Sequence, residues 1–338
     1  MKVTIKDVAK AAGVSASTVS RALHNNNRIS PEVRQRVQQI AREMDFHPNQ
    51  MARSLVSRQS RIIGAVFPGD IHMNLGNPFY PSLLQGMGHA ASEQRYHLLL
   101  ITGSESQSTE DASRQAVDSG YVSGLIHLAA ENEPQAESSV PTVVIGHPVN
   151  DWNRCSVDND NVEAGRIAAR YLIDRGHRRV LLLGYNPRFM FTVDRREGYE
   201  KALRESGLPV REEWVVSSRP LYVPEDGEVL ASLFRADDRP TAVVCMDDAQ
   251  AIALCQTLAQ LGLSVPEDVS LISFNNTEAS RYHNPPLTTI DVAPYQLGVH
   301  AMNLMLSMLR GETEASASIT VPITLVERNS VKVISEGV

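Results

Sequence analysis

The pattern of apolar and polar positions changes character near residue 60. In residues 4–46, apolar side chains recur every three or four positions in short runs, which indicates three small amphipathic helices. From Ile62 onward, short runs of Val, Ile and Leu alternate with longer stretches of helical periodicity. This second pattern is typical of βαβ units, in which parallel strands are buried between helices on both faces of a sheet.

Local signals set the limits of the three N-terminal helices. Thr4, Ser15 and Ser30 each stand before a helical repeat, where their hydroxyl groups can cap the first turn. Pro31 strengthens the third start, and Gly13 suits a tight turn between the first two helices. Two short helices joined by such a turn form a helix-turn-helix, whose second helix enters the major groove of DNA.

The second helix of this pair carries side chains suited to a DNA duplex. Its small residues permit close approach, its hydroxyl groups can bind phosphates, and Arg21 can bind a guanine edge through two hydrogen bonds. The small residues are Ala16 and Ser17, and the hydroxyl groups belong to Ser15, Thr18 and Ser20. Arg21 could instead pair with a phosphate or with solvent.

The rest of the chain predicts an α/β core. Strands are expected over 62–68, 97–103, 124–129, 142–147, 179–184, 213–218, 242–246 and 269–274. Helices are expected over 82–96, 108–120, 161–176, 193–207, 224–234 and 248–262. The alternation carries about ten strands, too many for one modest sheet, and the Val, Ile and Leu content is typical of strands buried on both faces.

Charge is divided unevenly between these two parts. Residues 1–61 hold 11 Lys and Arg against 4 Asp and Glu, a net charge of +7, whereas the remainder holds 21 against 35, a net charge of -14. A basic head on an acidic body indicates that only the head meets a polyanion. A solvated basic surface without a partner would show the same charge.

Other classes of function find little support. Cys155, Cys245 and Cys255 are too few and scattered for a disulfide framework or a metal cluster, and they are typical of free thiols in a reducing cytosol. Asp247 and Asp248 are neighbours at a strand end, so their side chains should point apart and form no catalytic pair. Without a hydrolase, zinc-protease or nucleotide-binding motif, we expect neither an enzyme nor a cofactor. Without a signal-peptide pattern or a bilayer-spanning run, we expect a cytoplasmic, nucleoid-associated protein with no membrane partner.

Three stretches carry a resemblance to a known family. They are TIKDVA, AGVSASTVSR and FHPNQMARSL, and they stand in order within the first 55 residues. Together they resemble the DNA-binding head of the lactose-repressor (LacI/GalR) family of transcriptional repressors. The resemblance extends over nearly the whole chain and implies a periplasmic-binding-protein-like core of two doubly wound parallel-sheet subdomains.

The resemblance also implies roles for individual residues of the head. The residues expected to contact base edges are Ala16, Ser17 and Arg21. Those expected to contact phosphates are Thr4, Ser15, Thr18 and Ser20. Asn49 would cap a hinge helix of about seven residues, which is too short to persist alone in water. In the family this helix pairs with a second copy over DNA, through Met51, Ala52 and Leu55. Leu55 matches the leucine wedge that kinks the minor groove, although an exposed leucine could instead pack on the core.

The expected organisation is a head at 1–48, a hinge at 49–61 and a core at 62–338. Within the core, the N-subdomain spans about 62–161 and 291–320, and the C-subdomain spans about 162–290 and 321–338. The chain would therefore cross between subdomains near 161, 290 and 321. Ligands of such sheets bind beyond the carboxyl ends of strands.

Candidate effector residues lie in the loops at those strand ends, over 68–80, 158–161 and 185–194 and at Gly146, Asp247 and Asn275. The family resemblance implies a ligand role for Arg195, and it places Asp247 and Asn275 at positions that face the effector. Phe79, Tyr80 and Tyr222 would pack against sugar rings, with core packing as the alternative, and Asp160 would accept a hydroxyl. Asn275 departs from the aspartate of the lactose repressor, which weakens a galactoside assignment. The stretches FPGDIHMNLGNPFYPSLLQG and SFNNT resemble the branch that represses maltose and maltodextrin genes.

The sequence therefore predicts a repressor of carbohydrate-utilisation genes that binds palindromic operator DNA as a homodimer and responds to an α-glucoside. Dimerisation would use the N-subdomain, chiefly helices 79–95 and 108–119, and the C-terminal stretch VERNSVKVISEGV lacks the leucine heptads that make lactose repressor a tetramer. Whether the effector releases or tightens DNA stays open. One alternative is a purine corepressor on the same architecture. The other is a sugar-transport binding protein, which would need a signal peptide and no DNA head.

Overall fold

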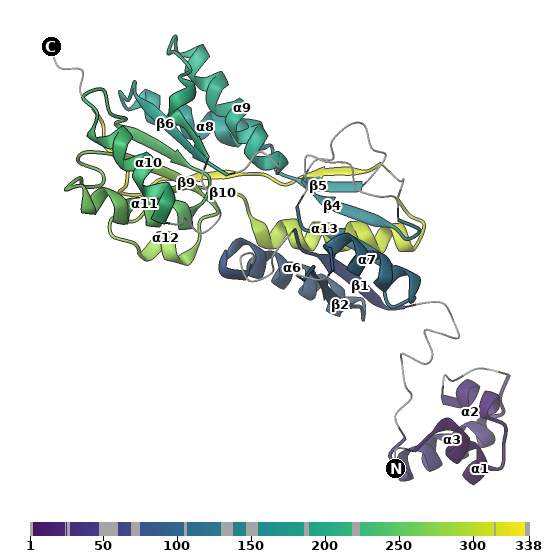
Figure 1. Cartoon of the computed structure of the whole chain (residues 1–338). Coiled ribbons are helices and arrows are strands. Elements are labelled where there is room, and N and C mark those ends of the chain that lie inside the picture. The colour runs from purple at the N-terminus through teal and green to yellow at the C-terminus, as the bar shows by residue number, and fades with distance from the viewer. Residues whose placement is uncertain are drawn as a thin grey trace. The chain divides into compact units, whose positions relative to one another are not determined.

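The computed structural model describes residues 3–23, 25, 28–46, 60–68, 75–104, 107–129, 138–146, 155–185, 189–217, 224–313 and 316–334. The chain divides into two compact units, Met1–Gln59 and Ser60–Val338 (Figure 1). We call the first unit the head and the second the core.

The head contains three short helices around a small apolar centre. They are α1 (Ile5–Ala12), α2 (Ala16–Leu23) and α3 (Pro31–Glu43). Val8, Val19 and Val37 are fully buried where the three helices meet. The predicted amphipathic spacing is confirmed, because the apolar stripe of each helix faces this centre.

The predicted helix limits of the head are also confirmed. The Thr4 amide donates to the carboxylate of Asp7 at 2.9 Å, which secures the start of α1. Gly13 has a φ of 64° and ends α1 in the left-handed region that a side chain would disfavour. The Ser15 hydroxyl accepts the Thr18 amide at 3.2 Å and so caps α2, and Ser30 caps α3.

The core is built on two six-stranded sheets. The first runs in the order β11-β5-β4-β3-β1-β2 and the second in the order β12-β10-β9-β8-β6-β7. The first sheet comprises β1 (Ile62–Val66), β2 (His97–Ile101), β3 (Gly124–His127), β4 (Thr142–Ile145), β5 (Cys155–Asp158) and β11 (Ser318–Thr320). The second comprises β6 (Val180–Gly184), β7 (Val215–Ser217), β8 (Ala242–Cys245), β9 (Ser270–Phe274), β10 (Thr288–Asp291) and β12 (Thr324–Val326). All neighbouring strands are parallel except β10 and β12.

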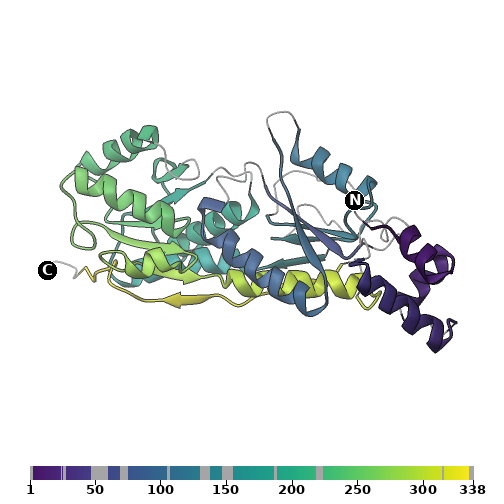
Figure 2. The ribbon, with the colours of Figure 1, turned by 90° about the horizontal axis from the view of Figure 1, so that it is seen from below.

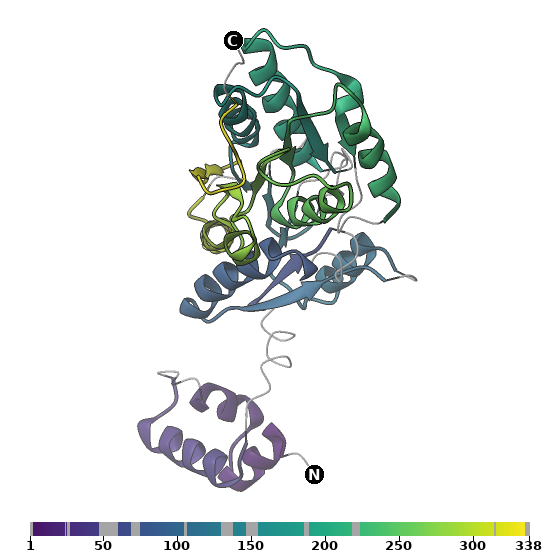
Figure 3. The ribbon, with the colours of Figure 1, turned by 90° about the vertical axis from the view of Figure 1, so that its left-hand side faces the viewer.

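Helices cover both faces of each sheet (Figures 2 and 3). The lobe around the first sheet, called the N-lobe, holds α6 (Phe79–Glu93), α7 (Thr109–Asp118) and α13 (Pro294–Leu309). The lobe around the second sheet, called the C-lobe, holds α8 (Asn161–Asp174), α9 (Met190–Glu205), the short 3-10 helix η1 (Glu212–Trp214), α10 (Pro224–Arg235), α11 (Asp248–Gln260) and α12 (Glu278–Tyr282).

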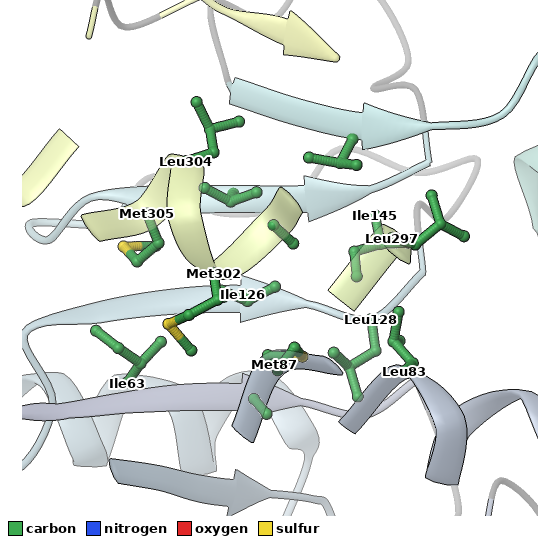
Figure 4. Close-up of a cluster of buried hydrophobic side chains, with 14 of the residues drawn as sticks. Ile63, Leu83, Met87, Ile126, Leu128, Ile145, Leu297, Met302, Leu304 and Met305 are labelled. Carbon is green, nitrogen blue, oxygen red and sulfur yellow. The ribbon is translucent and has the colours of Figure 1, made fainter. Parts of the chain in front are cut away.

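Figure 4 shows how α6 and α13 close one face of the first sheet. Met87 from α6 and Met302 from α13 are fully buried there against Ile126 of β3. A Cβ atom on Gly86 would lie 2.0 Å from the Tyr295 carbonyl oxygen, so the two helices can approach this closely only with glycine at that position.

The chain passes between the lobes three times. It leaves the first sheet after Asp158 and enters α8 at Asn161, returns from Asp291 to α13 at Pro294, and leaves again from Thr320 to β12. Each lobe is therefore assembled from segments that are distant in the sequence, and three adjacent connections join them.

Several elements differ from the sequence expectation. Helix α6 begins at Phe79, as in the expected dimerisation helix 79–95 and three residues before the expected range 82–96, and α9 begins at Met190 rather than at 193. Five elements of the core were not predicted from the sequence, namely strands β5, β10, β11 and β12 and helix α13. These strands mix Ser or Thr with only one or two of Val, Ile and Leu, so they lack the continuous apolar run of the expected strands. Helix α13 is apolar on most sides because it packs against both α6 and the sheet.

Candidate functional site

A cleft of about 640 Å³, which includes space open to solvent, lies between the two lobes of the core at the carboxyl ends of the strands. From the N-lobe side it is lined by residues that include Asn77, Phe79, Tyr80 and Asp158. From the C-lobe side it is lined by residues that include Asn161, Tyr185, Phe191, Arg195, Asp247 and Asn275. This is the edge where parallel sheets bind ligands.

Arg195 occupies the C-lobe wall and is held in one orientation. Its Nε donates to Asn161 Oδ1 at 3.0 Å, and its Nη1 donates to the Met246 carbonyl at 2.9 Å. The guanidinium carbon also lies 4.1 Å from the centre of the Phe274 ring. Within the described residues Nη2 makes no hydrogen bond, so it can donate to an oxygen atom of a ligand in the cleft.

Burial lowers the pKa of Arg195 to about 10, because a cation loses hydration inside the protein. The carboxylates of Asp158, Asp247 and Asp194 oppose this shift. Arg195 therefore remains a cation at neutral pH. One buried cation beside several carboxylates makes this wall poorly suited to a phosphate or another anion, and better suited to neutral hydroxyl groups.

Helix α9 reaches this position because it lies very close to α8. A Cβ atom on Gly165 would lie 2.1 Å from the Arg195 carbonyl oxygen, and one on Gly198 would lie 1.9 Å from the Val162 carbonyl oxygen. Glycine at both positions lets the two backbones touch. The contact brings Arg195 within hydrogen-bonding distance of Asn161 at the start of α8.

Asp247 joins the two walls of the cleft. Its Oδ2 accepts hydrogen bonds from the Tyr185 hydroxyl at 2.6 Å and from Asn77 Nδ2 at 2.9 Å. Its Oδ1 accepts the Gln250 amide and caps α11. Asn77 belongs to the N-lobe and Asp247 to the C-lobe, so this hydrogen bond spans the cleft. Burial raises the pKa of Asp247, and burial beside this carboxylate raises the pKa of Tyr185 well above its usual value.

The side chains of Asp247 and Asp248 point apart, as predicted, and Asp248 is not among the residues that line the cleft. Its Oδ1 accepts the hydroxyls of Ser273 and Thr289, and its Oδ2 accepts the Thr277 amide and hydroxyl. Asp248 and Asp247 thus have separate partners and form no acid–base pair. Asp248 instead secures the loop after β9, where Asn275 lines the cleft with a φ of 98°.

Aromatic side chains form the apolar part of the cleft. Phe79 and Tyr80 stand at the start of α6 with their ring centroids 5.3 Å apart, in an edge-to-face arrangement. The Asn77 side chain accepts the Phe79 amide at 3.0 Å and so places this helix start at the cleft. Both rings also contact the apolar core, so core packing and ligand contact are compatible roles here.

The structure brings together five of the seven candidate effector residues. Phe79, Tyr80, Arg195, Asp247 and Asn275 line the cleft.

The other two candidates are placed differently. Asp160 is not among the residues that line the cleft; its side chain accepts the Glu163 amide at 2.8 Å and caps α8. Its neighbours Asp158, Asn159 and Asn161 line the cleft instead. The physical reason is that Asp160, as the N-cap residue of α8, turns its carboxylate back to the helix amides. Tyr222 lies outside the described residues.

Sequence reasoning named the loops that hold Asn77, Asn161, Tyr185 and Phe191 but not these side chains individually. Each lies within a residue range expected at a strand end. Asn161 could have been found, because it is the first residue of the predicted helix 161–176 and directly follows a strand end, whereas Asn77 lies five residues before the predicted helix 82–96 and carries no such signal.

The head presents its candidate DNA-binding residues on α1 and α2. Thr4, Ser15, Ser17 and Arg21 are exposed, whereas Ala16, Thr18 and Ser20 are half-buried. The Ser15 hydroxyl lies 2.8 Å from that of Ser17 and 2.9 Å from that of Thr18. The candidate hinge residues Asn49, Met51, Ala52 and Leu55 lie outside the described residues.

The described residues offer little for other chemistries. They contain no group of three or more His, Cys, Asp or Glu side chains arranged to hold a metal ion. Among the described helices, none has the length and apolar character needed to cross a bilayer.

Comparison with known proteins identifies both units. Residues 4–49 match the family described as bacterial regulatory proteins, lacI family, and residues 169–331 match a periplasmic binding protein-like domain. The chain is 34% identical over 317 residues to the HTH-type transcriptional regulator MalR of Streptococcus pneumoniae, covering 91% of this chain and 93% of the relative. It is 30% identical over 336 residues to the HTH-type transcriptional repressor PurR of Histophilus somni, covering 97% and 99%.

A solved structure resembles both units. The transcriptional regulator CelR–cellobiose complex has a TM-score of 0.74 and 26% sequence identity, covering 97% of this chain and 100% of that one. The predicted head and two-sheet core are confirmed. The relatives are transcriptional regulators, which also confirms the expectation that the chain is not an enzyme.

Proposed function

The chain belongs to the lacI family of bacterial regulatory proteins and is a DNA-binding transcriptional repressor, and we propose that its effector is an α-glucoside sugar of the maltose or maltodextrin type. Its targets would be carbohydrate-utilisation genes. The observation that carries this proposal is the composition of the cleft, where hydrogen-bonding groups face aromatic rings.

A glucoside needs two kinds of surface. Its hydroxyl groups need donors and acceptors at fixed positions, and Arg195, Asp247 and Asn275 supply them. Its pyranose faces carry C–H groups that pack against rings such as Phe79 and Tyr80. Because the buried groups of the cleft already include carboxylates, a neutral sugar is favoured over a sugar phosphate.

Two similarities support a glucoside, and one supports a rival. MalR is a relative at 34% identity, and a similar structure holds cellobiose. PurR is a relative at 30% identity, which keeps a purine corepressor as the second candidate. A purine is flat and has no run of hydroxyl groups, so it would use the aromatic rings of the cleft and few of its polar groups.

Operator binding would require two heads. One helix-turn-helix reads a half-site, so a palindromic operator needs a dimer with two-fold symmetry. The N-lobe offers a surface for this, because β2 is the edge strand of its sheet and exposes Leu99 and Leu100. Exposed leucines on a sheet edge are typical of a covered interface. We therefore propose a homodimer formed through β2 with α6 and α7.

The proposed regulation follows from the two-lobed core. A sugar that bridges the cleft would change the angle between the lobes and thereby the relation between the two N-lobes of the dimer. Segment 49–61 connects each N-lobe to its head, so the change would reach the operator through that segment. A coupling of only a few kcal/mol is sufficient for this kind of control.

A gel-shift series tests the proposal. Full-length protein and operator DNA, first obtained by selection from random duplexes, are titrated with maltose, maltotriose, trehalose, sucrose, lactose and hypoxanthine. We expect maltose or maltotriose to change operator affinity, in either direction. A response to hypoxanthine alone would refute the glucoside and favour the purine candidate, and failure to select any duplex would refute operator recognition.

A further inference from the structure

The three connections between the lobes are tied together by one buried side chain. Asn159 stands on the first connection, and its Nδ2 donates to the Val292 carbonyl on the second at 3.2 Å and to the Val321 carbonyl on the third at 2.9 Å. Both N–H groups of its side-chain amide thus donate to backbone carbonyls, one on each of the other two connections. Asn159 is 7% exposed, so water cannot readily replace these partners.

The backbone amide of the same residue is linked to the effector cleft. Arg195 Nε donates to Asn161 Oδ1 at 3.0 Å, and Asn161 Nδ2 donates to Asp158 Oδ1 at 2.9 Å. Asp158 Oδ1 also accepts the backbone amide of Asn159 at 2.7 Å. Four residues therefore form a continuous chain of hydrogen bonds from the guanidinium group in the cleft to the connections between the lobes.

A second path from the cleft reaches the same place. Asn275 lines the cleft, and its neighbour Asn276 donates to Asp291 Oδ2 at 3.0 Å. Asp291 Oδ1 accepts the Ala293 amide at 2.7 Å, directly beside Val292 on the second connection. Two series of hydrogen bonds therefore link residues of the cleft to the second connection.

We propose that Asn159 is a positioning residue that couples effector binding to lobe movement, and that Asn161 links it to Arg195. The inference rests on the proposed function, because it concerns how an effector in the cleft acts. It gives Asn159, which also lines the cleft, the role of coupling a bound effector to the lobe connections.

The physical argument concerns the geometry of one amide group. Its two N–H bonds have fixed directions, and each hydrogen bond weakens outside about 2.7–3.2 Å. Rotation of one lobe against the other changes the spacing of the three connections, so both bonds hold only over a narrow range of lobe angles. A ligand that binds Arg195 would shift Asn161 and Asp158 through their hydrogen bonds, and would thereby change the lobe angles at which Asn159 keeps both of its bonds.

The test uses Asn159→Ala and Asn161→Ala in the full-length protein. The measured quantity is the ratio of operator dissociation constants with and without saturating maltose, which is independent of moderate changes in sugar affinity. We expect a wild-type ratio on the order of 10 to 100 in either direction, within the usual range of allosteric coupling, and a ratio of about 3 or less in both variants.

Ser330→Ala is the matched control. Ser330 is fully buried and bonds backbone on both sides, accepting the Thr288 amide and donating to the Leu271 carbonyl, but both partners lie within the C-lobe. It should lose stability and keep the wild-type ratio. If Asn159→Ala does not fold, Asn159→Ser, which keeps one donor, takes its place and should give an intermediate ratio.

Hydrogen exchange in the free protein separates this inference from the proposed effector. Asn159→Ala should speed amide exchange in segments 291–294 and 320–323, whereas Ser330→Ala should leave both unchanged. Folded variants at positions 159 and 161 that keep the full maltose ratio would overturn the inference, as would unchanged exchange in both segments. If maltose did not change the operator affinity of the wild-type protein, the proposed α-glucoside effector would be refuted, and the exchange experiment would still test the role of Asn159.

Discussion

Replacing Arg195 with alanine should abolish the effector response and leave DNA binding intact. The side chain is buried and makes two hydrogen bonds, to Asn161 and to the Met246 carbonyl. Its remaining donors would be available to a ligand in the cleft, and a charge-assisted hydrogen bond contributes about 1.5–3 kcal/mol. At about 1.4 kcal/mol per factor of ten, two such bonds to a sugar correspond to a loss of affinity of about 100-fold or more.

The same substitution has a cost in stability that must be separated from its effect on binding. Alanine leaves the Asn161 and Met246 acceptors buried without a partner, at about 1–3 kcal/mol each. We therefore expect a lower melting temperature of the core, while the head, a separate compact unit, keeps its fold. Two-step thermal unfolding followed by circular dichroism measures this difference.

Arg196→Ala is the matched control for this experiment. Arg196 is the next residue on α9, but its side chain points to the surface and pairs with Glu200 at 2.7 Å and Glu212 at 2.9 Å. It should keep both sugar affinity and operator affinity. Calorimetric titration with maltose and gel shifts with operator are the two assays.

One result would refute the reasoning for Arg195. If Arg195→Ala lost operator binding but retained sugar binding, the residue would serve the head rather than the cleft. Equal losses of sugar affinity in Arg195→Ala and Arg196→Ala would show that a general change in α9, and not the buried guanidinium group, was measured.

Four further predictions follow from the structure and the sequence. Gly165→Ala should weaken maltose binding at least tenfold in calorimetry, because the new methyl group displaces the Arg195 backbone; an unchanged affinity would contradict the close approach of α8 and α9. Asn77→Ala should change maltose affinity and not the free operator affinity, because it removes the bond to Asp247 across the cleft, and a variant with wild-type titrations would argue against a role for that bond. Burial lowers the pKa of His177 to about 4, so the unfolded chain binds a proton on this histidine below pH 6.5 that the folded protein does not bind until the pH nears 4. The free energy of unfolding should therefore fall by up to about 3 kcal/mol between pH 6.5 and 4 in urea titrations, and this fall should be missing in His177→Gln. Equal pH profiles of the two proteins would exclude this role of His177. Leu55→Ala should reduce DNA bending and specific affinity in circular-permutation gel assays, and unaltered bending would count against the wedge.

Much of the fold was predictable because its signals are local. Thr4, Gly13, Ser15 and Ser30 set the helix limits of the head through hydrogen bonds and backbone angles that span three residues or fewer. The alternation of apolar strands and amphipathic helices likewise predicted parallel sheets with helices on both faces, whereas the division into two subdomains came from the family resemblance. Strands such as β10 and β11 were missed because polar residues flank a single isoleucine in each, which leaves no continuous apolar run.

The amino-acid sequence by itself determined that this chain has a basic DNA-binding head, an α/β core and polar side chains at the strand ends, because charge, capping and periodicity act over a few residues. Only the tertiary structure decided which of those side chains meet. Asn77 and Asp247 are 170 residues apart and share a hydrogen bond, and Asn159 reaches carbonyls at 292 and 321. The physical reason is that such contacts depend on how two discontinuous lobes pack, through close approaches such as that of Gly165 to Arg195, and no local pattern encodes that distance.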